Sequence, residues 1–265
     1  YTGDPGCYQK NAAYLDAVTP SKMKATFAKW IDDTPYVLTI LPTDKYSVGE
    51  TDLDRSAGIP FPTEKVEFQF PTLQTATLSN GAKVVLAQRK GVPLVEMNFQ
   101  FNFGYAQENN DELGYTNFMM GMLNEGTKKY SSLEFDEVLD SLGSNLGFGS
   151  GLDTSVATLS SLKANLSQTL DLAKEALINP TFPEKEIERI KKETLAGIIQ
   201  EENRPASIAY RNIGKLLYGD NHPYGKPLTG SGISETISSI TRANIMDVHS
   251  RAINSAHLTF AVAGD

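Results

Sequence analysis

The stretch GYTNFMMGMLNEGT, residues 114–127, decides the fold of the region around it. Its apolar residues recur at helical spacing, at Tyr115, Phe118, Met119, Met122 and Leu123. Acidic Asp111 and Glu112 stand just before it, where negative charge favours the start of a helix, and Gly126 stands where a helix commonly stops. The pattern predicts a buried helix over about residues 112–125, capped at both ends.

The segments around this helix alternate between strand and helix patterns. Upstream, TATLSNGAKVVLAQR predicts a hairpin that turns at Asn80-Gly81, and Pro93–Phe103 predicts a third strand. Downstream, helices are predicted over 131–143, 165–178, 184–202, 205–218, 233–239 and 241–253, and strands over 144–150, 154–162 and 257–262. The order predicts an α+β fold in which a mainly antiparallel sheet packs against helices on one face.

The first 72 residues differ in kind. Thr19 and Pro20 open a helix that runs to Asp32, with Met23 and Phe27 on its apolar face, and residues 36–41 form a short strand pattern. Residues 43–72 hold several prolines and glycines with little periodicity, which is typical of a linker at a domain boundary.

Composition limits the function. The net charge of −8 argues against nucleic acid or an anionic membrane as partner, and no apolar run is long enough to cross a bilayer. The chain opens at YTGDPGCYQK, without a starting Met or a signal peptide, so we expect a mature chain or an excised piece of a longer one. Its single Cys7 cannot form an intramolecular disulfide, and three histidines limit any His-based metal site.

Residues 75–265 resemble the insulinase-like zinc metallopeptidases (family M16). The resemblance lies in LSNGAKVVL, in GYTNFMMGMLNEGT, in ENRPASIAYRNIGKLLYGDNHPYGKPLTG and in the closing SITRANIMDVHSRAINSAHLTFAVAGD, in the order of the family. It implies three regions: a C-terminal remnant of a preceding M16-like half at 1–42, a linker at 43–72, and an M16-like domain of inactive type at 73–265. The isolated strand pattern at 36–41 is then expected to pack against the main domain or a neighbouring molecule.

Active members of this family carry an inverted zinc motif, His-x-x-Glu-His, on the helix that matches residues 114–127. Two His side chains four residues apart face one side of a helix and reach one Zn²⁺, and the Glu can take a proton from the metal-bound water. Gly114 and the Met-Leu-x-x-Gly-Thr that ends at Thr127 set the register. Asn117 then lies where the first His belongs, Met120 where the Glu belongs and Gly121 where the second His belongs. The third ligand, a Glu on a later helix, falls at Ala196 or Gly197. The resemblance therefore implies neither a catalytic residue nor a metal ligand in this chain.

Other residues that could rebuild a metal site are Glu193, Glu201, Glu202, Asp220 and His222. The glutamates are more simply interpreted as solvated residues at the end of a helix. His222 is more simply interpreted as a turn residue that is hydrogen-bonded to the backbone. His249 and His257 are interpreted as structural, and Cys7 has no base nearby that would make it a nucleophile. The methionines of residues 119–122 are interpreted as core, with a peptide-binding surface as the alternative.

The resemblance leaves three functional hypotheses. The first is a zinc-less half of a peptidase whose two halves close around peptide substrates, with the zinc in a catalytic half of the same polypeptide or in a separate subunit. The second is a structural or scaffolding protein with no proteolytic role, and the third is an enzyme with a relocated metal site. Whether the chain belongs to an active enzyme is left open, and family members with two halves suggest the periplasm.

Overall fold

The computed structural model describes residues 7–31, 37–39, 71–254 and 258–265. The chain divides into two compact units, Tyr1–Lys65 and Val66–Asp265, which are described separately. The predicted strand at 36–41 and the linker at 43–72 lie largely outside the described residues. Residues 37–39, which are described, belong to no strand.

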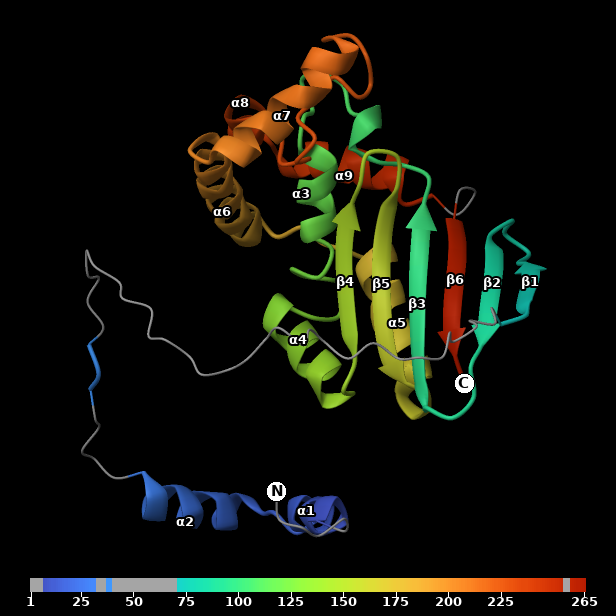
Figure 1. Ribbon diagram of the computed structural model, residues 1–265, viewed down its shortest axis with the longest axis vertical. Helices are drawn as coiled ribbons and strands as arrows, with labels where there is room; N and C mark the ends of the chain where they lie inside the picture. Colours follow the sequence, from blue (N-terminus) through green and yellow to red (C-terminus); the bar gives the residue numbers. More distant parts are fainter. Residues whose placement is uncertain (1–6, 32–36, 40–70, 255–257) are drawn as a thin grey trace, which may run out of the picture. The chain divides into compact units, whose positions relative to one another are not determined.

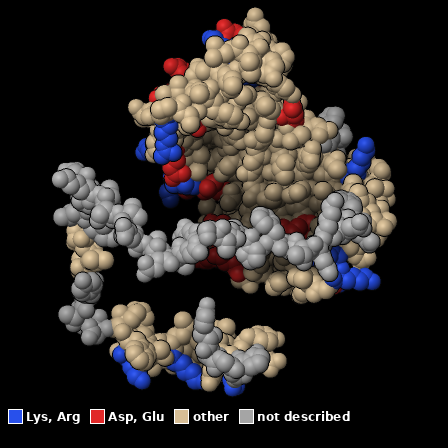
Figure 2. All heavy atoms as spheres, in the orientation of Figure 1, with Lys and Arg blue, Asp and Glu red and all other residues tan. Residues whose placement is uncertain are grey.

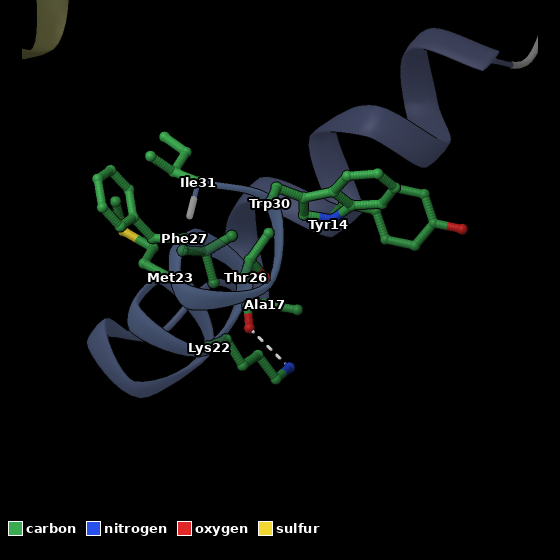
Figure 3. A pocket seen from close by; sticks show the side chains of 9 residues that line it. Tyr14, Ala17, Lys22, Met23, Thr26, Phe27, Trp30 and Ile31 are labelled. Atoms are coloured by element: carbon green, nitrogen blue, oxygen red, sulfur yellow. Dashed lines mark hydrogen bonds between the residues drawn. The ribbon is translucent and has the colours of Figure 1, made fainter. Parts of the chain in front are cut away.

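The first unit contains two helices, α1 (Cys7–Asp16) and α2 (Pro20–Trp30). The sequence predicted α2 and its N-cap correctly, since the Thr19 hydroxyl accepts a hydrogen bond from the amide of Lys22 at 3.3 Å. An open recess of about 570 Å³ lies beside the two helices, lined by apolar side chains that include Met23, Phe27 and Trp30 (Figure 3). None of the described residues of this unit is buried.

The second unit is built on one mixed sheet of six strands. These are β1 (Leu73–Thr77), β2 (Lys83–Gln88), β3 (Leu94–Phe101), β4 (Asn145–Ser150), β5 (Ser155–Leu162) and β6 (Leu258–Gly264), in the spatial order β1-β2-β6-β3-β5-β4 (Figure 1). Four of the neighbouring pairs are antiparallel, as predicted, but β2 pairs with β6 in parallel. The last strand of the chain therefore lies in the middle of the sheet and joins the first hairpin to the rest.

The helices of this unit cover one face of the sheet and one end of it. They are α3 (Tyr115–Gly121), α4 (Ser132–Ser141), α5 (Leu166–Ile178), α6 (Glu184–Glu202), α7 (Pro205–Tyr218), α8 (Ser234–Ser239) and α9 (Arg242–Ala252), with 3₁₀ turns at Tyr105–Gln107 and Lys163–Asn165. In Figure 1, α5 lies behind the sheet, and α6, α7 and α8 gather with α3 near one end of β4. Strand β3 alternates between the two faces of the sheet, since Val95, Phe99 and Phe101 are buried and their neighbours in the chain are exposed.

Local signals account for most of these boundaries. The Ser131 hydroxyl accepts from the amide of Glu134 at 3.4 Å while the Glu134 carboxylate accepts from the amide of Ser131 at 2.9 Å, and these two hydrogen bonds form a capping box at the start of α4. Gly81 adopts a φ of 85° in the turn between β1 and β2. Asn165 stands at the start of α5 but does not cap it, because its side chain donates to the carbonyl of Leu142 at 2.8 Å.

Candidate functional site

The helix predicted over residues 112–125 is α3, which is shorter than predicted. It covers only Tyr115–Gly121 and continues as turns toward Gly126. The predicted N-terminal partners are wrong, because the carboxylate that meets this end belongs to Glu108. Its two oxygens accept from the amides of Gly114 at 2.8 Å and Thr116 at 2.7 Å. Burial raises the pKa of Glu108 above its usual range, and these two hydrogen bonds act in the opposite direction.

Asn117, which the resemblance places at the first ligand position, uses both ends of its amide within the protein. Its Nδ2 donates to the carbonyl of Gly230 at 3.0 Å, and its Oδ1 accepts from the amide of Ser150 at 3.0 Å. Helix α3 is thereby tied to the end of β4 and to the loop before α8. The packing is close, since a Cβ on Gly230 would lie 2.3 Å from Nδ2 of Asn117. The side chain is a link between three segments and is not free to bind a ligand.

The other motif positions fit zinc no better. Met120 is 0% exposed and packs in the hydrophobic core beside Phe118 and Met119, so a carboxylate there would have to be buried. Gly121, Ala196 and Gly197 offer no ligand atom in their side chains. Around both glycines the space for a Cβ is open. The residues at these positions do not fit a zinc ion.

The remaining sequence candidates are dispersed over the unit. Each of the acidic candidates Glu193, Glu201 and Asp220 is engaged by a cation: Glu193 by Arg189 at 3.0 Å, Glu201 by Arg211 at 2.6 Å and Asp220 by Lys215 at 2.9 Å. Glu202 is exposed at the end of α6. Within the part of the chain that the structure describes, no three His, Cys, Asp or Glu side chains converge so that they could hold a metal ion.

The two histidines that the structure describes, His222 and His249, contact the backbone of the protein. Nδ1 of His222 accepts from the amide of Tyr224 at 3.0 Å, and its ring stacks on Tyr218. Nε2 of His249 lies 2.8 Å from the carbonyl of Leu177, and burial lowers the pKa of His249. His257 lies outside the described residues. Cys7 is a free, partly exposed thiol.

Sequence reasoning missed a buried lysine next to this helix. The Nζ of Lys226 donates to the carbonyls of Ala106 at 2.8 Å and of Glu108, and burial lowers the pKa of Lys226 while Glu108 and Glu112 oppose the shift. It joins the segment before α3 to the loop after α7. A lysine in a turn-rich stretch gives no sequence signal of burial, since lysines are mostly exposed.

The second unit is therefore an α+β domain whose helix α3 carries a linking side chain, Asn117, and a core side chain, Met120. The family model for insulinase (peptidase family M16) matches residues 83–231, more than half of the chain. The chain belongs to this family. Residues 83–231 include all the motif positions considered above.

Individual relatives agree with this assignment. An uncharacterized zinc protease of Rickettsia felis is 26% identical over 188 residues, which are 71% of this chain and 45% of that protein. The crystal structure of a peptidase M16 inactive domain from Pseudomonas fluorescens is 31% identical, with a TM-score of 0.70 over 73% of this chain and 47% of the other. The periplasmic protease PqqL from Escherichia coli shares the fold at 21% identity, with a TM-score of 0.64 over 73% of this chain and 22% of its own. This chain thus spans less than half the length of these relatives.

Among the described residues, no helix is both long and apolar enough to cross a membrane.

Proposed function

We propose that this chain is a zinc-less, non-catalytic half of an M16 metallopeptidase. In this proposal it forms one wall of a chamber that closes around peptide substrates, and the zinc site lies in a catalytic half of the same polypeptide or in a separate subunit. Residues 1–42 are then the end of the preceding half, 43–72 the linker, and 73–265 the inactive domain.

The observation that carries the proposal is the use made of Asn117. Both ends of its amide link α3 to Ser150 and Gly230, so the helix that holds zinc in active relatives has a structural task here. The complete burial of Met120 supports the same conclusion. The Pseudomonas fluorescens relative is described as an inactive M16 domain, which favours a half without chemistry of its own.

The relatives are longer than this chain, which supports a partner half. The chain matches 45% of the Rickettsia felis zinc protease and 22% of PqqL, so in those proteins a domain of this kind accompanies further sequence. PqqL is described as a periplasmic protease, which supports the periplasm as the compartment of this protein.

The test compares the chain alone with the chain joined to a catalytic half that contains an intact His-x-x-Glu-His. The chain alone, purified without chelator, is expected to hold much less than one zinc per molecule and to leave quenched-fluorescence peptides uncut. The joined protein is expected to bind about one zinc and to cleave the same peptides until a chelator is added. Stoichiometric zinc and cleavage by the chain alone would contradict the proposal. A joined protein that binds zinc but cleaves no peptide would favour the scaffolding alternative.

A further inference from the structure

A cavity of about 480 Å³ opens between the sheet and helix α5, and the described residues that line it all belong to the second unit. Its floor is aromatic. Phe99 and Phe101 of β3 are 6% and 2% exposed, and Phe260 of β6 meets Phe99 edge to face, with the ring centroids 5.1 Å apart. Because Phe99 and Phe260 are also paired across the two strands, the backbone hydrogen bonds of the sheet hold this floor in place.

Helix α5 forms one wall of the cavity with a single stripe of side chains. Leu170, Lys174, Leu177 and Ile178 all line the cavity, and their spacing places them on one face of the helix. Leu177 is 6% exposed, whereas Ile178 is 62% exposed. The wall therefore runs from the core of the domain to the solvent, so a ligand could enter without unfolding any element.

The polar groups at the cavity are hydrogen-bond donors. Lys174 is exposed, and within the described part of the chain its Nζ has neither an ion pair nor a hydrogen bond. Its hydrocarbon stem can lie along the wall while the ammonium group stays in water. The Oδ1 of Asn80 accepts from the amide of Ala82 at 3.1 Å, which leaves the Nδ2 of Asn80 to donate. No Asp or Glu is among the described residues that line the cavity.

We propose that this cavity binds the hydrocarbon chain of a single-chain carboxylate, an anion of the fatty-acid type, whose head group meets Lys174. Cavities of about 300–1,000 Å³ that are lined by apolar and aromatic side chains with few polar groups are typical of small-molecule sites. A carboxylate forms a charge-assisted hydrogen bond with an ammonium group. A cationic amphiphile would be repelled by Lys174, and a neutral one would leave it without a partner. The inference does not rest on the proposed function, since neither zinc nor a catalytic half takes part in it.

The experiment is isothermal titration calorimetry of the 265-residue chain with hexanoate, octanoate, decanoate and dodecanoate. One site per chain is expected, and the dissociation constant should fall about fourfold for each CH₂ group added, until the cavity is full. Decanol and decyltrimethylammonium carry the same chain with a neutral and a positive head group. Decanoate should bind about tenfold more tightly than decanol, and decyltrimethylammonium should bind more weakly than either.

Two pairs of variants test the charge and the space separately. K174E should weaken decanoate binding about tenfold and leave decanol binding unchanged. Its control is K192E, the same charge change at an exposed lysine of α6, a helix that carries charged side chains of both signs (Figure 2). L170W places a larger side chain at the cavity and should weaken the binding of both ligands. Its control is L133W, because Leu133 is 69% exposed on α4 outside the cavity. Circular dichroism verifies that each variant is folded.

The place of binding is tested with a second apolar recess in view, the one beside α1 and α2. The single tryptophan, Trp30, lines that recess, so its fluorescence should stay constant as decanoate saturates the wild type. A photoreactive diazirine derivative of decanoate should label peptides from α5 and β6. The proposal would be overturned by an absence of binding, by equal affinities for decanoate and decanol, or by K174E and K192E binding decanoate equally well. A change at Trp30 with labelling of α2 would also overturn it, because the ligand would then occupy the first unit.

Discussion

Removing the amide of Asn117 is the most direct test of its structural task. In N117A the carbonyl of Gly230 and the amide of Ser150 each lose a partner at 3.0 Å. A net hydrogen bond contributes about 0.5–1.5 kcal/mol, and a half-buried group left without a partner costs more. Two such losses amount to about 2–3 kcal/mol. Ala has the higher helix propensity and returns about 0.5 kcal/mol, so we expect a net destabilisation of about 2 kcal/mol.

The assay is urea unfolding followed by far-ultraviolet circular dichroism, because the single tryptophan, Trp30, lies in the other unit of the chain. For a domain of about 200 residues, 2 kcal/mol corresponds to a fall in Tm of roughly 4–8 °C. Amide hydrogen exchange supplies a local readout, since Ser150 should lose protection selectively. Q168A, which truncates an exposed side chain on α5, is the control and should change stability by less than about 0.5 kcal/mol.

The variant N117H introduces the residue type that the resemblance implies for active family members at this position. Imidazole cannot reproduce both amide contacts, and the space beside Gly230 is already filled, so N117H should be at least as destabilised as N117A. The reasoning is refuted if N117A unfolds within about 0.5 kcal/mol of the wild type, or if N117H is as stable as the wild type.

Three further outcomes follow from the same region and its surroundings. M120E should destabilise the domain by about 3 kcal/mol or more because it places a carboxylate in the core, whereas M120L should cost less than about 1.5 kcal/mol; equal urea midpoints for the two would contradict the burial of Met120. G121A should be neutral or stabilising by up to about 1 kcal/mol in thermal melts, because its Cβ meets open space and Ala favours the helix. Burial lowers the pKa of His249, so the unfolded chain binds the proton more readily and stability should fall as the pH decreases through about 6.5, the unfolded value. H249Q should lose this part of the pH dependence between pH 7.5 and 5.5, and an unchanged pH dependence would show that another group causes it.

Much of the secondary structure was predictable because its signals act within a few residues. Helices α6 and α7 begin and end where the sequence predicted, since prolines stand at their starts and Gly219 follows α7. The α4 capping box depends on Ser131 and Glu134, three residues apart. The parallel pairing of β2 with β6 was missed because hairpin signals describe neighbours in the chain, and these two strands are about 170 residues apart.

At the site, too, short-range features were predictable and long-range contacts were not. The register of the motif predicts that Asn117, Met120 and Gly121 stand where active relatives have ligands and a base, and this requires only the sequence. The capping of α3 by Glu108 was not predicted, because its carboxylate reaches Thr116, eight residues along the chain. Asp111 and Glu112 were expected at that end, but Glu112 binds Arg251 at 2.8 Å instead.

The sequence by itself determined the family, the order of helices and strands, and the residue types at the positions that the resemblance matches to metal ligands. These properties depend on short-range patterns and on motif spacing, which a linear chain displays fully. Only the tertiary structure decided what those residues do: Asn117 joins segments 33 and 113 residues away, and α7 turns its aliphatic side outward because Arg211 and Gly214 pack inward. Contacts between segments that are distant in the chain form only when the whole domain folds. Which face of a helix is buried depends on the residues that pack against that face, and these belong to other parts of the chain.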